Sequence, residues 1–239
     1  MNKAISILIV ISLLLLSGCS INPKKTLNPA QSSIDWVDFV KLGSVQYSGL
    51  FSVVLLEPER VSEEAAGEVR FHVADNVTNP SYRIQSGDAA YLSKGTKLYQ
   101  VEGYDPDELL AVESSTHPYG YKLYAAEDAR AQFHTSYDKL DKQAIKHVYL
   151  YRDEQGMPVE VAALDAEESQ TLTDILDAGV VQTSFTPSRS FGDPIYYELV
   201  IDTGEPIATS YSLVDDGLQI AFYSSATRIV DDSIRQWLN

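Results

Sequence analysis

The sequence predicts an α+β fold in which β-structure dominates. Apolar and polar residues alternate along residues 68–74 and 98–103, as they do in strands that are buried on one face. One long helical pattern, over residues 166–178, lies among the strands of the second half. Fifteen tyrosines stand against seven phenylalanines, which favours half-buried strand positions where the ring packs inward and the hydroxyl reaches water. We therefore expect two small antiparallel β-rich subdomains with a few short helices.

The first half of the folded body, from residue 34, is expected to form a meander or a small barrel. A segment with mixed strand-like and helical features leads into a strand that can break at Gly49, and a turn or short helix follows at Pro58. The last two strands are joined through His117 and Pro118. The expected strands are residues 45–56, 68–74, 98–103, 109–113 and 119–124.

The second half is expected to begin with a hairpin and a helix. A strand over residues 145–151 turns and returns over residues 158–163. Asp165 is a suitable N-cap, because Glu168 stands three residues later as in a capping box. Gly179 stands where helices commonly end.

Three strands and a closing helix are expected to complete this half. The strands are residues 196–202, 207–214 and 218–223. Asp216 and Gly217 join the last two, and this pair is a strong two-residue hairpin signal. Val230, Ile234 and Leu238 then lie at helical spacing and predict a short C-terminal helix that docks on the sheet.

A short apolar run followed by a cysteine occupies the N-terminus. Lys3 supplies a positive charge ahead of the apolar residues 4–16. At 13 residues this run is shorter than the roughly 20 that a membrane-spanning helix needs, and it has the length of a signal-peptide core. The small residues Ser17 and Gly18 then lead to Cys19, the only cysteine of the chain.

This arrangement, Leu16-Ser17-Gly18-Cys19 after a basic start and an apolar run, resembles the precursor of a bacterial lipoprotein. The resemblance implies cleavage between Gly18 and Cys19 and attachment of fatty acyl chains such as palmitate to Cys19. Two or three acyl chains hold a protein durably on a bilayer. Two alternatives are an ordinary secreted protein with a chance cysteine and an uncleaved membrane anchor.

The resemblance also implies a location in the cell envelope. The protein would be anchored on the outer face of the plasma membrane or, in a cell with two membranes, on the outer membrane. The second destination follows because Ser20, and not an aspartate, comes after the cysteine. The rest of the chain resembles the uncharacterised β-rich lipoproteins of bacterial envelopes.

Composition divides the chain into five segments. We expect a signal peptide at residues 1–18, a polar flexible tether at 19–33, an N-terminal β-rich subdomain at 34–125, a connector at 126–144 and a C-terminal α+β subdomain at 145–239.

The chain is strongly acidic, with 18 basic and 34 acidic residues and a net charge of −16. Such a body lacks the basic surface that nucleic acids require, and anionic lipid headgroups would repel it. The resemblance to lipoproteins implies that the partners are the membrane, through the acyl chains, and an envelope protein or a cell-wall component. Nucleic acid is not expected.

No motif in the sequence indicates a catalytic residue, a metal site or a cofactor. The chain has no Gly-x-Ser-x-Gly motif, and its four histidines do not occur at the short spacings of zinc ligands. The sole cysteine is expected to be acylated. We therefore expect a non-enzymatic binding or structural module, with a cell-wall hydrolase that uses some of the many acidic residues as the alternative.

One group of aromatic residues is a candidate binding face. Aromatic faces commonly bind peptides and saccharides, but alternation along the strands would turn about half of these rings inward. The candidates are Tyr99, Tyr104, Tyr119, Tyr121 and Tyr124.

Overall fold

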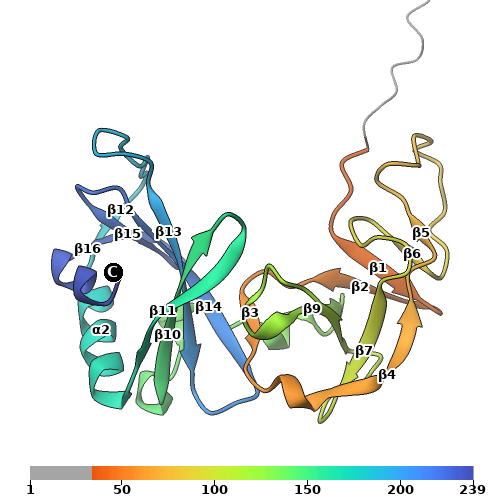
Figure 1. The fold of residues 1–239 in the computed structure, drawn as a ribbon, viewed down its shortest axis with the longest axis horizontal. Helices are drawn as coiled ribbons and strands as arrows, with labels where there is room; N and C mark the ends of the chain where they lie inside the picture. Colours follow the sequence, from red (N-terminus) through yellow and green to blue (C-terminus); the bar gives the residue numbers. More distant parts are fainter. Residues whose placement is uncertain (1–33, 239) are drawn as a thin grey trace, which may run out of the picture. The chain divides into compact units, whose positions relative to one another are not determined.

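The computed structural model describes residues 34–238, so Gly18, Cys19, the expected signal peptide and the expected tether lie outside the described residues. The described chain is dominated by two β-sheets, and within it α2 (Ala166–Ala178) is the one α-helix (Figure 1). The expected dominance of β-structure is confirmed. Among these residues no helix is long and apolar enough to cross a bilayer.

The first sheet has the strand order β4-β7-β8-β9-β2-β1-β6-β5. Neighbouring strands are antiparallel, except for β5 and β6, which run parallel. Leu98, Leu109 and Leu123 are fully buried in the core that this sheet forms. The strands are β1 (Phe39–Leu42), β2 (Val45–Gly49), β4 (Val61–Glu68), β5 (Phe71–His72), β6 (Asp88–Ala89), β7 (Lys97–Val101), β8 (Leu109–Glu113) and β9 (Tyr121–Ala126).

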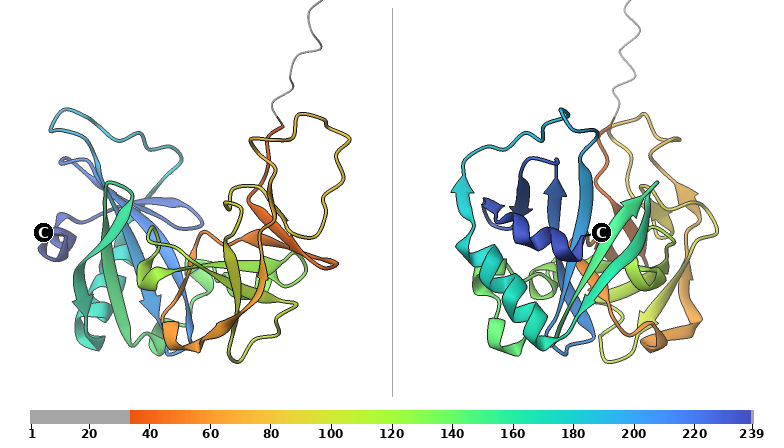
Figure 2. Two further views of the ribbon diagram at one scale, coloured as in Figure 1. Left: turned by 45° about the vertical axis from the view of Figure 1, so that its right-hand side comes forward. Right: turned by 60° about the vertical axis from the view of Figure 1, so that its left-hand side comes forward.

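The second sheet has the order β11-β10-β13-β14-β15-β16-β12 and is antiparallel throughout. Leu172 and Leu176 of α2 share one core with Leu150 and Leu199 of the sheet, so α2 covers one face (Figures 1 and 2). The strands are β10 (His147–Glu154), β11 (Met157–Leu164), β12 (Val180–Gln182), β13 (Ile195–Asp202), β14 (Ile207–Asp215), β15 (Ile220–Tyr223) and β16 (Thr227–Val230).

The helix begins where its capping residues predict. Asp165 Oδ1 accepts hydrogen bonds from the backbone N–H groups of Glu167 and Glu168, both at 3.0 Å. The Glu168 side chain accepts in turn from the backbone N–H of Asp165 at 3.3 Å. The predicted capping box is therefore confirmed.

The strand expected over residues 45–56 is divided between the two sheets. β2 ends at Gly49, where a Cβ would overlap the Asp38 carboxylate, so a glycine is needed for this close approach. The chain then forms β3 (Val53–Leu55), which pairs with β14 of the second sheet in the register Val54↔Ala208. Val54 and Ala208 belong to a small buried cluster with Tyr151 and Val200.

Four strands were not expected from the sequence: β4, β6, β12 and β16. β4 follows the 3-10 helix η1 (Pro58–Arg60) and occupies the edge of the first sheet, with most of its side chains exposed or half-buried. A strand exposed on both faces has no apolar alternation to reveal it. The strand expected over residues 68–74 is correspondingly short, since only Phe71–His72 pair there.

Short 3-10 helices occupy the segment between the two halves and the end of the chain. Residues 126–144 contain η3 (Arg130–Phe133), η4 (Tyr137–Lys139) and η5 (Lys142–Ala144), and η2 (Pro118–Gly120) precedes β9. The expected C-terminal helix is replaced by the six-residue 3-10 helix η6 (Asp232–Trp237), after which Leu238 is buried. The expected two-residue hairpin between β14 and β15 is a four-residue connection, because the register closes at Asp215↔Ile220.

Candidate functional site

A cavity of about 720 Å³ opens on the second sheet, on the face opposite α2. Successive side chains of a strand point to opposite faces, so β13 turns Tyr197 and Leu199 toward the core and Tyr196 and Glu198 toward the cavity, which Tyr197 also borders. A cavity of this size accommodates a small molecule or a short segment of a polymer.

Long-range contacts build the walls of this cavity. The connection between β2 and β3 contributes Phe51 and Ser52, and the backbone carbonyl of Ser52 accepts a hydrogen bond from the N–H of Ser210 at 2.9 Å. The remaining walls come from four other segments, namely Thr116; His134, Ser136 and Tyr137; Tyr151, Arg152, Asp153, Gly156, Met157 and Pro158; and Tyr223, Ser224 and Ser225.

Tyr137 fixes the wall that precedes β10. Its fully buried ring packs edge-on against Phe222, with 4.8 Å between ring centres, and against Tyr211, at 5.5 Å. The Tyr211 hydroxyl donates to the backbone carbonyl of Thr135 at 2.8 Å. These contacts hold the expected connector against the sheet, so the cavity has a packed wall at this end.

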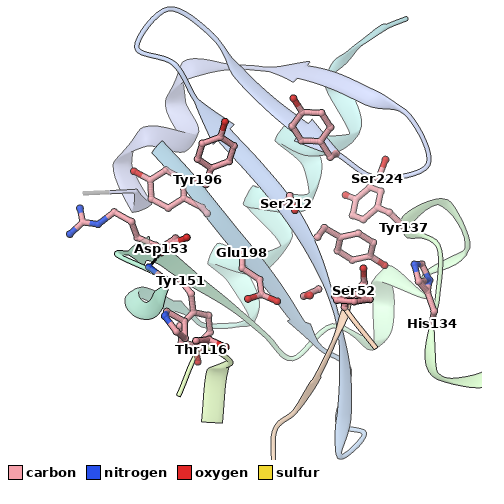
Figure 3. A pocket seen from close by; sticks show the side chains of 18 of the residues that line it. Ser52, Thr116, His134, Tyr137, Tyr151, Asp153, Tyr196, Glu198, Ser212 and Ser224 are labelled. Atoms are coloured by element: carbon pink, nitrogen blue, oxygen red, sulfur yellow. Dashed lines mark hydrogen bonds between the residues drawn. The ribbon is translucent and has the colours of Figure 1, made fainter. Parts of the chain in front are cut away.

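Glu198 places a carboxylate inside the cavity. Figure 3 shows this carboxylate pointing into the space between Tyr151 on one side and Ser52 on the other. Burial raises the pKa of Glu198 above its ordinary value, and a hydrogen bond from Ser210 opposes this shift. No basic side chain among residues 34–238 forms an ion pair with Glu198.

Tyrosine hydroxyls and serines supply most of the other polar groups in the cavity. Burial raises the pKa of Tyr211 to about 12 and also raises that of Tyr151. Both hydroxyls therefore stay protonated at neutral pH. The Tyr151 hydroxyl donates to Glu160 Oε2 at 3.2 Å.

Exposed apolar side chains surround the mouth of the cavity. Phe51 is 70% exposed, and Met157 and Tyr196 are each 54% exposed. Apolar side chains gathered at the rim of a polar cavity are typical of a binding site. Asp153 also lines this cavity and is held by a hydrogen bond from the N–H of Gly156 at 2.6 Å.

A buried ion pair lies beneath Phe51. Lys122 Nζ lies 2.5 Å from Asp38 Oδ2, and the Tyr124 hydroxyl donates to Asp38 Oδ1 at 3.1 Å. The same ammonium group lies 4.6 Å from the centre of the Phe51 ring. This cation–π contact links an aromatic residue of the cavity to the core of the first sheet.

The five tyrosines that the sequence singles out do not share one surface. Tyr99 of β7 pairs with Ala111 of β8, and Tyr121 of β9 pairs with Glu113 of β8. Ala111 and Glu113 are two residues apart and so share a face of the strand, which means that Tyr99 and Tyr121 point to the same face of the first sheet. Tyr124 points to the opposite face and is 1% exposed.

The other two tyrosines lie elsewhere. Tyr104 lines a second cavity of about 380 Å³ and packs on Phe133, with 5.8 Å between ring centres. Tyr119 packs edge-on against Tyr149 and Tyr151. It therefore supports a wall residue of the larger cavity without lining that cavity itself.

Sequence reasoning did not single out the residues at the centre of the cavity. Tyr196 and Glu198 alternate with core residues along β13, as Ser210 and Ser212 do along β14. That alternation was a signal that part of one face of these strands is polar, although Val200 and Ala208 farther along the same face are buried. It could not show that distant segments enclose this face.

The described residues do not contain three histidine, cysteine, aspartate or glutamate side chains grouped so that they could hold a metal ion. His117 is the histidine with the clearest polar contacts, since its Nδ1 lies 2.9 Å from Ser114 Oγ. Burial lowers the pKa of His117, and the nearby Lys122 lowers it further. His117 does not line the larger cavity.

No protein-family model matches the chain, and no curated protein or solved structure matches it. The chemistry of the cavity therefore has to be argued from the residues that line it.

Proposed function

We propose that this protein is an exported lipoprotein of a bacterial cell envelope that binds a ligand in the cavity of its second sheet. Cys19 would carry the acyl chains, and the tether behind it would let the body stand away from the membrane surface. The cavity, which combines exposed aromatic side chains with a carboxylate, is the observation that carries the binding role.

The proposal includes a body of two β-rich subdomains, with the helical segment at the chain end as its last element. Each sheet has its own buried core, which supports the division. The pairing of β3 with β14 would then couple the subdomain that follows the tether to the subdomain that holds most of the cavity. The partner would be an envelope protein or a cell-wall component.

Anchoring is tested by replacing Cys19 with serine in the native host. The wild-type protein should incorporate a labelled fatty acid and partition into detergent, because two or more acyl chains bind a bilayer durably. Cys19→Ser should lose the label and partition into the aqueous phase. Equal labelling of both proteins would refute the anchor.

Binding is tested by purifying the protein from native membranes with its anchor intact. A stoichiometric partner should accompany the wild-type protein and be lost with Tyr196→Ala, which removes an exposed ring at the mouth of the cavity. Tyr91→Ala is the matched control, because Tyr91 is equally exposed, at 54%, and does not line the cavity. Retention of the partner by Tyr196→Ala would contradict the assignment of the site.

Hydrolysis of cell-wall polymers is a second candidate, and one observation favours it. Glu198 and Asp153 both line the cavity, and the pKa of Glu198 is raised by burial, as is typical of a general acid in glycoside hydrolysis. Release of soluble fragments from peptidoglycan by the wild-type protein, but not by Glu198→Gln, would support this alternative over the binding module.

A further inference from the structure

Glu198 is half-buried and lacks the partners that the carboxylates Asp38, Asp215 and Asp216 have. Asp38 pairs with Lys122, and Asp215 accepts two hydrogen bonds from the Arg235 guanidinium, both at 2.8 Å. Asp216 accepts from three backbone N–H groups at 2.7–2.9 Å. Glu198 instead has one neutral hydroxyl, that of Ser210.

A carboxylate withdrawn from water without a cation is unfavourable, and the raised pKa of Glu198 reflects this cost. In a closed core such a group would be replaced or paired. Glu198 lies in an open cavity, where a positively charged ligand group can reach it and offset its lost hydration.

The other charges in the cavity favour the same sign of ligand. Asp153 adds a second carboxylate, whereas the guanidinium of Arg152 is bound to Glu154. The net charge of the chain is −16, so its field attracts cations and repels anions. An anionic ligand would meet Glu198 with no unpaired lysine or arginine among the residues that line the cavity.

The tyrosine rings extend this recognition to the body of the ligand. Tyr196 at the mouth and Tyr151 inside provide two aromatic rings near Glu198 (Figure 3). Aromatic faces attract cations and stack against flat or ring-shaped groups. The chain itself uses this interaction where Lys142 Nζ lies 4.6 Å from the centre of the Tyr137 ring.

We propose that the cavity binds a cationic ligand, in which an organic ammonium or guanidinium group pairs with Glu198 and a ring-shaped body packs against the tyrosines. This inference rests on the proposed binding function and names the chemistry of its ligand. The cation donates hydrogen bonds to the carboxylate oxygens while the serine hydroxyls bind the polar edges of the ligand.

The test uses tryptamine and tryptophol, which have the same indole ring and chain but differ in carrying an ammonium or a hydroxyl group. Calorimetric titration of the full-length protein in neutral detergent should show tryptamine binding about tenfold or more tightly than tryptophol, because a charge-assisted hydrogen bond replaces a neutral one. Glu198→Gln should lower the tryptamine affinity to that of tryptophol and leave tryptophol binding unchanged. Glu113→Gln, the same substitution at an exposed position outside the cavity, should behave as the wild type.

Equal binding of the two probes by the wild-type protein would overturn the inference, and so would an absence of tryptamine binding. The wild-type comparison requires no variant to fold, so it decides the question even if Glu198→Gln is unstable. Capture of a partner through Tyr196 without any preference for tryptamine would overturn the inference and leave the proposed function standing. Tryptamine preference without a captured partner would support the inference and count against the envelope-binding function.

Discussion

Replacing Lys122 with methionine should destabilise the protein, because it removes the cation that pairs with a buried carboxylate. Lys122 Nζ lies 2.5 Å from Asp38 Oδ2, and these side chains are 16% and 4% exposed. The Tyr124 hydroxyl would still donate to Asp38, but a neutral group does not balance the charge. The variant would therefore leave the buried Asp38 carboxylate without a cation to balance its charge.

The size of this effect follows from the burial of the pair. Removing one partner of a buried ion pair costs about 3–5 kcal/mol. For a chain of this length each kcal/mol lowers the melting temperature by about 2–4 °C, so a fall of about 6–20 °C is expected. Loss of the Lys122 ammonium also ends its contact with the Phe51 ring, which should loosen one side of the cavity mouth.

Urea unfolding of the full-length protein, followed by circular dichroism, measures the change. Arg130→Met is the matched control, because it breaks an exposed pair with Glu127 whose side chains are 44% and 76% exposed. That control should lose less than about 1 kcal/mol. The double variant Asp38→Asn, Lys122→Met should lose less free energy of unfolding than the two single variants lose together, by about 0.5–3 kcal/mol. A loss for Lys122→Met no larger than that for Arg130→Met would refute the reasoning.

Two further predictions concern the capping box and the cavity carboxylate. Asp165→Ala should lower the free energy of unfolding by about 1 kcal/mol, because the N–H groups of Glu167 and Glu168 lose their acceptor, and thermal unfolding checks this. An unchanged melting temperature would contradict it. The folded protein raises the pKa of Glu198, so its ionised form opposes folding and Glu198→Gln should be more stable than the wild type at neutral pH. The difference in the free energy of unfolding between the two proteins should shrink as the pH falls and vanish below the unfolded-state pKa of about 4.3. Equal stability of the two proteins at neutral pH and below would contradict this prediction.

Local features of this chain could be read from the sequence because they depend on neighbouring residues. The capping box of α2 needs only Asp165 and Glu168, and the strand breaks at Gly49, a residue whose missing Cβ leaves room for the Asp38 carboxylate. The C-terminal segment was less predictable. Ile234 and Leu238 are buried as their spacing indicates, but the segment winds as a 3-10 helix.

The edge strands could not be predicted for a physical reason. β4 and β12 are exposed along most of their length, so no hydrophobic pattern marks them, and their pairing with β7 and β16 is what makes them strands. The sequence also did not show which of the two sheets β3 would join. An apolar triplet such as Val53–Leu55 suits either sheet, and only the pairing with β14 decides between them.

The sequence by itself determined the β-dominant class and the position of the helix, and it carries the motif around Cys19 on which the expected anchor depends. Only the tertiary structure decided where a ligand could bind. The cavity requires Ser52 to meet Ser210 and Tyr137 to pack on Phe222, and these partners are far apart in the chain. Local propensity acts over a few residues, whereas packing brings distant residues together, and so Glu198 became a candidate only once its surroundings were known.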